Sequence, residues 1–243
     1  MKQPPGFTIG SKVCKLKRSL YGLKQSARQW NIEIDKVLKE SGCTQSQSDM
    51  CLYTFKSNGK SGFVIIHVDD FLITGDESVV TKLSENIGNK IILKDLGEVS
   101  EFLAIRVTKK DRNYYVDQTK YIEKIIEAAN LTDAKPSKMP MDTGYHKLYS
   151  SIEKADQDQY QKLIGMLLYV AVNSRPDIAA SVSILSQRLS KPTKTDMNEV
   201  KRLIRYLKGT KDAKLQVSGC GNLNPEVYSD TDWGQGQDRR EIQ

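Results

Sequence analysis

The sequence lacks the cysteine and histidine spacings that hold zinc or build a disulfide framework. Its four cysteines are scattered without a C-x-x-C pair, and it has only two histidines. These features argue against zinc fingers and thioredoxin-type redox sites. Scattered cysteines fit a reducing compartment better than a disulfide-bonded exterior.

Apolar segments of the kind that direct or anchor a chain in a membrane are also missing. The N-terminus has no apolar signal region, and no apolar run reaches the length of a membrane span. We therefore expect a cytoplasmic or nuclear protein without a membrane partner. The sequence does not choose between those two compartments, and it leaves the oligomeric state unknown.

Acidic residues are absent from residues 1–30, although the whole chain carries a net charge of +7. The basic residues of this stretch are Lys2, Lys12, Lys15, Lys17, Arg18, Lys24 and Arg28. A one-signed stretch repels itself unless an anion or a partner offsets it, which favours a phosphate-bearing partner. A solvated basic surface explains the net charge equally well.

Periodicity predicts an α+β fold in which strands precede a helical group. Ser26 and Gln29 match the S-x-x-Q capping box, and Gly42 would end the helix that follows. Asn58-Gly59 predicts a tight hairpin turn. The remaining patterns predict strands over 51–55, 63–68, 71–74, 102–108 and 114–116, and helices over 79–87 and 119–130.

The C-terminal half reads as a linker followed by helices. Prolines and Gly144 mark residues 131–156 as the linker. Helices are expected over 157–173, 177–190 and 196–208, the last with Thr195 as its N-cap.

The adjacent carboxylates of Asp69-Asp70 lie between two apolar segments of strand type. Two aspartates at the tip of a buried hairpin repel each other, and a divalent cation removes that penalty. By itself such a dipeptide is more often an ordinary turn on a solvated hairpin. The surrounding motifs change that assessment.

Blocks spread over nearly the whole chain are similar to those of copia-type reverse transcriptases, in the family's order. The matching residues are Ser19 to Gln25 with Arg28 and Trp30, Val68 to Asp70, Lys94 to Glu98, Phe102 to Ile105, Arg175 to Ile178, Lys191 to Thr193, Arg205 to Thr210, and Tyr228 to Trp233. The chain is thus identified as resembling a retrovirus-related Pol polyprotein. The resemblance implies a polymerase palm, an antiparallel sheet with helices, followed by a helical thumb-like region.

The resemblance also assigns roles to individual residues. Asp69 and Asp70 would hold Mg²⁺ (or Mn²⁺) as catalytic carboxylates. Tyr21 and Gly22 would lie beside the incoming deoxynucleoside triphosphate, although Gly22 could simply form a turn. Lys24 or Arg28 would reach phosphate, with a solvated lysine as the alternative. In the same scheme Lys94 would lie near the pyrophosphate, and Phe102 with Leu103 would belong to the primer grip.

One helix carries polar and small residues at regular spacing. Gln161, Gly165 and Tyr169 lie on one face of the helix over 157–173, at positions i, i+4 and i+8. That face resembles the thumb helix that tracks an RNA template–DNA primer duplex. Close helix packing at Gly165 is the competing explanation. The helix over 196–208 has Lys201, Arg202, Arg205 and Lys208 on one face, suited either to phosphate contacts or to solvent.

Departures from the family pattern concern both ends and single positions. We expect a further catalytic aspartate and the fingers to lie outside this chain, and only Asp230 (with Asp232) of a truncated RNase H domain to lie within it. Ala27 stands in place of a usual proline and Ala104 in place of a usual glycine. His67 stands in place of a usual aromatic residue, and a core or strand role is favoured for it.

These expectations define four segments and three functional hypotheses. The segments are a partial palm (1–117), a helix and linker (118–156), a thumb-like region (157–210), and a tether with the start of RNase H (211–243). The first hypothesis is part of an RNA-directed DNA polymerase that is inactive by itself. The others are a nucleic-acid-binding remnant and a degenerate or co-opted transposon product.

Overall fold

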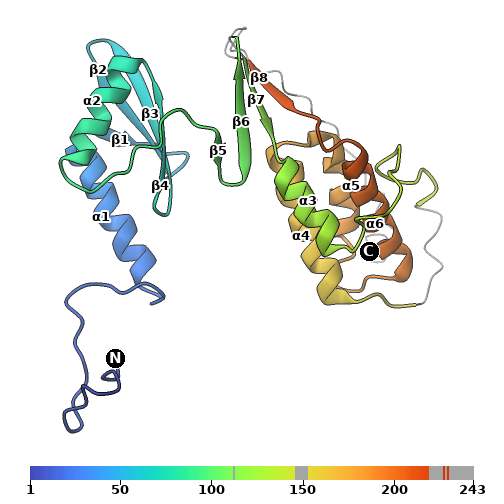
Figure 1. The fold of residues 1–243 in the computed structure, drawn as a ribbon, viewed down its shortest axis with the longest axis horizontal. Coiled ribbons are helices and arrows are strands. Elements are labelled where there is room, and N and C mark those ends of the chain that lie inside the picture. The colour runs from blue at the N-terminus through green and yellow to red at the C-terminus, as the bar shows by residue number, and fades with distance from the viewer. Residues whose placement is uncertain (112, 146–152, 219–226, 228, 230–243) are drawn as a thin grey trace, which may run out of the picture. The chain divides into compact units, whose positions relative to one another are not determined.

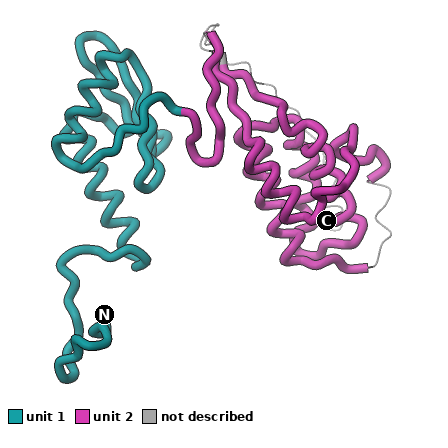
Figure 2. The backbone as a smooth tube through the Cα atoms, viewed as in Figure 1, with its two compact units in different colours: residues 1–99 teal, residues 100–243 magenta. Residues whose placement is uncertain are grey.

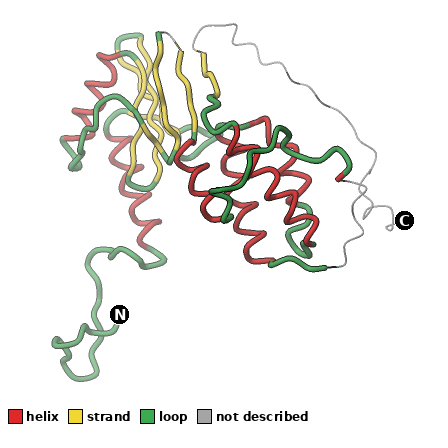
Figure 3. The backbone as a smooth tube through the Cα atoms, turned by 45° about the vertical axis from the view of Figure 1, so that its right-hand side comes forward, coloured by secondary structure: helices red, strands yellow, loops and turns green. Residues whose placement is uncertain are grey.

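The chain folds into two compact units, each with one antiparallel sheet. The computed structural model describes residues 1–111, 113–145, 153–218, 227 and 229. The units are Met1–Val99 and Ser100–Gln243, drawn in teal and magenta in Figure 2. Figure 3 colours the helices and strands of the chain. The mixed helix and antiparallel-sheet class expected from the sequence is confirmed.

The first unit is a four-stranded sheet with two helices (Figure 1). Its elements are α1 (Ser26–Glu40), β1 (Cys43–Gln45), β2 (Leu52–Ser57), β3 (Lys60–His67), β4 (Asp70–Gly75) and α2 (Glu77–Gly88). The strands lie in the order β1-β2-β3-β4, and all neighbours are antiparallel. The predicted turn at Asn58-Gly59 is present, with φ of +52° and +76°, as a two-residue hairpin requires.

One face of this sheet is covered by both helices. Alternate residues of β3 are buried, and Val64 and Ile66 pack with Leu38 of α1 and Leu83 of α2. The opposite face remains open, since Phe63 is exposed. An antiparallel sheet commonly shows this division into a covered and an open face.

The second unit combines a sheet with a helical bundle. Its elements are β5 (Glu101–Phe102), β6 (Ile105–Lys110), β7 (Asn113–Asp117), α3 (Thr119–Ala128), α4 (Gln157–Asn173), the 3-10 helix η2 (Pro176–Ile178), α5 (Ala179–Ser186), α6 (Lys194–Gly209) and β8 (Leu215–Ser218). The strands pair in the order β5-β6-β7-β8. Four helices share one core, which contains Ile125, Leu167, Val182 and Leu203. No helix of the described ranges is long and apolar enough to cross a membrane.

Two predicted helix caps are wrong. Ser26 is the first residue of α1, and its hydroxyl donates to the Leu20 carbonyl instead of capping the helix. Helix α6 starts before the expected position, because Thr193 rather than Thr195 is the N-cap. Thr193 forms a capping box with Asp196, whose carboxylate accepts from the Thr193 N–H at 2.7 Å. Either threonine fits the local pattern, but only Thr193 has an acidic residue three positions later.

The strands differ from the prediction at three places. The single strand expected over 102–108 is interrupted, since Leu103 and Ala104 both have positive φ and turn β5 into β6. Strand β1 was not predicted, and neither was β8, which pairs with β7 across about a hundred residues of sequence. In short, partly exposed strands the local sequence gives little indication of pairing with a distant strand.

Candidate functional site

The turn that joins β3 to β4 carries the predicted catalytic pair. His67 and Asp70 are cross-strand partners, so Val68 and Asp69 form a two-residue hairpin turn. Val68 has φ of +57°. A β-branched side chain is rarely found at positive φ, because its Cβ crowds the backbone. Strained residues of this kind cluster at functional sites.

Asp69 and Asp70 are both exposed at this turn. The strands behind them are buried on one face, but the carboxylates themselves are exposed, so the expected buried hairpin tip is wrong. Across the described ranges, neither carboxylate has a hydrogen-bond or ion-pair partner from a side chain. Two exposed carboxylates suit Mg²⁺, which usually takes one or two protein carboxylates and fills its other positions with water and phosphate.

Within the described part of the chain, no third protein ligand accompanies the pair. No group of three or more His, Cys, Asp or Glu residues that could hold a metal occurs among the residues that the structure describes. His67 is exposed at the end of β3, opposite Asp70 in the ladder. The expectation of a strand histidine therefore holds for His67, and a place in the core does not.

Trp30 connects helix α1 to the turn. Its indole Nε1–H donates to the Val68 carbonyl oxygen at 2.5 Å. The bond fixes the peptide that leads into Asp69. From the sequence, Trp30 could be identified as a member of a motif block, but its contact with the turn could not, since its indole partner lies 38 residues away.

The predicted nucleotide-binding residues lie on exposed loops of the same unit. Tyr21, Gly22 and Lys24 precede α1, and Gly22 has φ of +89° with open space around its Cα. Lys94 is exposed in the segment after α2. No hydrogen bond or ion pair joins these four residues to the aspartates in the described part of the chain. Their grouping around a nucleotide therefore stays a prediction.

The second unit joins the predicted primer grip to the predicted thumb helix. The Tyr169 hydroxyl of α4 donates to the Leu103 carbonyl oxygen at 2.5 Å. Its ring meets that of Tyr121 edge-on, with centroids 5.2 Å apart. Tyr169 is therefore directed at the β5–β6 hairpin, in which Phe102 ends β5 and Leu103 begins the turn, and it is only partly exposed. Burial raises the pKa of its hydroxyl, which stays protonated as a donor.

The other two residues of the α4 face have different surroundings. The Gln161 side chain donates to the Leu189 carbonyl at 3.0 Å. Gly165 is exposed, and a Cβ built on it would meet no heavy atom of the described residues within 4 Å. Close helix packing at Gly165, the competing explanation, is therefore wrong.

The basic face of α6 contacts residues of the linker, which was defined as residues 131–156. Arg202 pairs with Asp142 at 3.0 Å, and Arg205 donates to the Lys135 carbonyl at 2.6 Å. Lys208 donates to the Ala134 carbonyl at 2.8 Å. Three of the four basic side chains expected to face phosphate or solvent thus make contacts within the fold.

Two of the sequence blocks meet in one hydrogen-bonded network around the buried Arg175. Arg175, only 3% exposed, contacts Asp177 through two nitrogens at 2.7 and 2.9 Å, and donates to the Thr210 carbonyl at 2.9 Å. Tyr206 donates to Asp177 at 2.9 Å. The hydrogen bonds from Arg175 hold the pKa of Asp177 below its usual range. Asp230 and Asp232, the expected RNase H remnant, lie outside the described residues.

Comparison with known proteins agrees with this arrangement of motifs. Residues 1–143 match the family model described as reverse transcriptase (RNA-dependent DNA polymerase). The chain is 35% identical over 256 residues to a retrovirus-related Pol polyprotein from transposon TNT 1-94 of Nicotiana tabacum, covering 99% of this chain and 19% of that protein. It is 34% identical over 243 residues to the polyprotein from transposon RE1 of Arabidopsis thaliana, covering 98% of this chain and 16% of that protein.

A yeast relative of more similar length also matches. A putative transposon Ty5-1 protein of Saccharomyces cerevisiae is 28% identical over 241 residues, covering 96% of this chain and 78% of that protein. No solved structure matches the chain. This chain spans less than a fifth of the length of the two plant polyproteins that it matches. Together, the family model and these relatives show that the chain belongs to the reverse transcriptase (RNA-dependent DNA polymerase) family, in the copia-type group of retrotransposons.

Proposed function

We propose that this chain supplies part of the active site of an RNA-directed DNA polymerase. The observation that carries the proposal is the exposed Asp69-Asp70 pair on a strained hairpin turn that Trp30 holds. Mg²⁺ (or Mn²⁺) would bind the two carboxylates, together with phosphates of the deoxynucleoside triphosphate. Such ions, when bound, activate the primer 3′-hydroxyl and stabilise the leaving pyrophosphate.

The chain's own residues would bind and orient the reactants. Tyr21 and Gly22 would lie against the nucleotide, and the open space around Gly22 supports close approach of a ligand. Lys24 and Lys94 are exposed and carry the charge that phosphates require. Residues 1–30 contain seven basic and no acidic side chains, so this segment suits electrostatic contact with nucleic acid.

In this proposal residues 1–117 form the palm, 118–156 a connecting helix and linker, and 157–210 the thumb. Residues 211–243 are a tether with the beginning of an RNase H domain. The hydrogen bond between Tyr169 and Leu103 supports a functional link between thumb helix and primer grip. The open surface at Gly165 supports approach of a duplex to that helix.

A complete metal site needs a further carboxylate beside the pair. Strand β4, which begins with Asp70, is an edge strand of its sheet among the described strands. An unpaired edge can accept another strand through its backbone groups. We propose that a further strand with the missing aspartate pairs there, and that the 243 residues without it do not extend a primer.

A primer-extension assay tests this function with the full chain, Mg²⁺, all four nucleotides and a DNA primer on an RNA template. We expect the chain to bind the hybrid, more weakly as salt rises, and to add no nucleotide. Extension that disappears in Asp69→Asn would overturn the proposed incompleteness. Absence of hybrid binding at low salt would overturn the nucleic-acid role altogether.

The alternative is a non-catalytic module that binds a duplex, as a remnant or co-opted product. The lack of a third ligand near the pair favours it within the described residues. The two readings differ in metal dependence. A polymerase site should gain affinity for a recessed hybrid when Mn²⁺ is added, and a simple binding module should not.

A further inference from the structure

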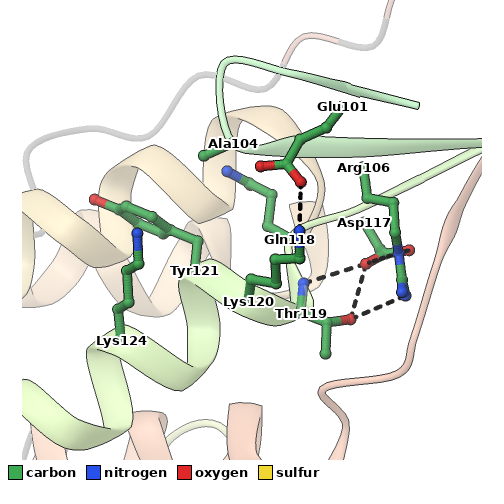
Figure 4. A pocket seen from close by; sticks show the side chains of 9 residues that line it. All are labelled: Glu101, Ala104, Arg106, Asp117, Gln118, Thr119, Lys120, Tyr121 and Lys124. Atoms are coloured by element: carbon green, nitrogen blue, oxygen red, sulfur yellow. Dashed lines mark hydrogen bonds and ion pairs between the residues drawn. The ribbon is translucent and has the colours of Figure 1, made fainter. Parts of the chain in front are cut away.

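A small pocket lies between the β5–β6 hairpin and the first turn of α3 (Figure 4). Its volume of about 70 Å³ is enough for several waters or one small oxyanion. The lining residues are Glu101, Ala104, Arg106, Asp117, Gln118, Thr119, Lys120, Tyr121 and Lys124. All of them belong to the second unit, so the pocket depends on one compact body.

Gln118 presents an unsatisfied donor at this pocket. The side chain is 1% exposed, and its Oε1 accepts from the Ser174 hydroxyl at 2.8 Å. Its Nε2 has no hydrogen-bond partner among the described residues, and no other buried side-chain nitrogen or oxygen of those residues shares this state. In Figure 4 the side chain points toward the hairpin that carries Glu101 and Ala104. A buried amide without a partner is costly, so such a group calls for a ligand.

The charges around the pocket favour an anion. Arg106 pairs with Asp117 at 2.9 Å, and Lys120 pairs with Glu101 at 2.7 Å. Once these two pairs are formed, the charge left among the lining residues is that of Lys124. Glu101 therefore does not repel an incoming anion with its full charge.

The start of α3 adds further positive potential. Gln118 occupies the N-cap position but makes no capping hydrogen bond, and the first turn contains no acidic residue. The first N–H groups of a helix carry a partial positive charge and lack partners within the helix. Asp117 accepts from the Thr119 N–H at 3.2 Å, so part of this potential is offset. Lys120 and Tyr121 of the same turn also line the pocket.

We propose that this pocket binds a phosphate group of the nucleic-acid backbone through the Gln118 amide and the Lys124 ammonium. Only the source of the phosphate rests on the proposed function. The site adjoins the turn at Leu103 and Ala104, which was assigned to the primer grip. A phosphate held there would fix the duplex backbone beside that turn. Inorganic phosphate shares the same chemistry and serves as a probe of the pocket itself.

Two substitutions test the site without depending on each other. Gln118→Glu keeps the oxygen that accepts from Ser174 and replaces the free amide with a carboxylate oxygen. Lys124→Ala removes the surplus charge from an exposed position on α3. Lys36→Ala on α1 is the control, because it removes one exposed lysine charge from a helix elsewhere. All variants are first compared with the parent chain by circular dichroism and melting temperature.

Two arms then separate the sources of phosphate. In the first arm, inorganic phosphate should raise the melting temperature of the parent chain above that in chloride of equal ionic strength. This shift should vanish in Gln118→Glu and shrink in Lys124→Ala. In the second arm, the dissociation constant for an RNA–DNA hybrid should rise about tenfold in Gln118→Glu and severalfold in Lys124→Ala, with no change in the control.

The possible outcomes are distinct. A phosphate-dependent shift without any change in hybrid binding would overturn the nucleic-acid source. The absence of both responses would overturn the pocket as an anion site. If the parent chain binds no hybrid but shows the Gln118-dependent phosphate shift, the proposed function fails and the anion site stands.

Discussion

The indole nitrogen of Trp30 lies 2.5 Å from the carbonyl oxygen of Val68, and the hydrogen bond between them joins helix α1 to the turn before Asp69. Val68 holds positive φ at that turn, although valine tolerates it poorly. The hydrogen bond from Trp30 thus acts on the same residue that has the unfavourable φ, and it helps to hold that conformation. This relationship gives Trp30 a positioning role for the aspartate pair.

Trp30→Phe should weaken metal binding at the turn while leaving the fold intact. Phenylalanine keeps the apolar ring but removes the N–H, so the Val68 carbonyl loses its partner. We expect the affinity for Mn²⁺, measured by electron paramagnetic resonance, to fall about tenfold, as for other groups that orient metal ligands. The melting temperature should change by only a few degrees. Equal Mn²⁺ affinity in Trp30→Phe and the parent chain would show that the bond does not position the carboxylates.

Ala104→Gly should stabilise the protein. Ala104 has φ of +57°, a region that costs an L-residue roughly 1 kcal/mol and glycine almost nothing. Urea unfolding should therefore give a free energy of unfolding higher by about 1 kcal/mol. The same substitution at Ala180, an exposed residue of α5, is the matched control and should destabilise by a similar amount. A loss of stability at both positions would contradict a strained turn.

Gly165→Ala should raise the stability of the protein and lower its affinity for an RNA–DNA hybrid. The glycine lies within α4 in open space, so alanine should raise the free energy of unfolding by roughly 0.5–1 kcal/mol. The added methyl group would stand where a duplex is proposed to approach, so affinity for an RNA–DNA hybrid should fall. Anisotropy of a labelled hybrid measures this. A variant that is more stable and binds equally well would remove Gly165 from the proposed surface.

The ion pair between Arg175 and Asp177 should make stability depend on pH. Hydrogen bonds from Arg175 lower the pKa of Asp177 in the folded state. Its contribution is therefore present above the unfolded pKa, near 3.9, and is lost as the pH falls through the lower folded pKa. The stability difference between the parent chain and Asp177→Asn should shrink from pH 7 to pH 3. A difference that stays constant over this range would mean that the ionised carboxylate adds nothing.

Local signals account for the parts of the fold that could be predicted from sequence. Asn58-Gly59 can adopt the positive φ of a hairpin turn, and α4 was located because its apolar residues recur at helical spacing. The turn at Leu103 and Ala104 could not be predicted in the same way, since neither residue favours positive φ. Its conformation depends on strand pairing and on the contact with Tyr169.

The candidate site likewise contains residues that the sequence identifies and residues that it does not. Asp69 and Asp70 were found because their motif is contiguous, and the structure places them on an exposed turn. Trp30 and Gln118 were missed as functional residues, because their significance lies in contacts that only the folded chain creates. The hydrogen bond of Trp30 spans 38 residues, and the unpaired Gln118 amide of the described structure can be identified only when its buried neighbours are known.

Iron-mediated cleavage tests most directly whether Asp69 and Asp70 hold a metal ion against a primer–template. With hydrogen peroxide and ascorbate added, Fe²⁺ bound in place of Mg²⁺ reduces the peroxide to hydroxyl radicals, which cleave the protein and nucleic-acid backbones close to the ion. With a recessed RNA–DNA hybrid bound, we predict cleavage of the chain at residues 67–71 and of the primer near its 3′ end. Both should be suppressed by excess Mg²⁺ and absent in Asp69→Asn. The same cleavage pattern in Asp69→Asn as in the parent chain would contradict the proposed metal site.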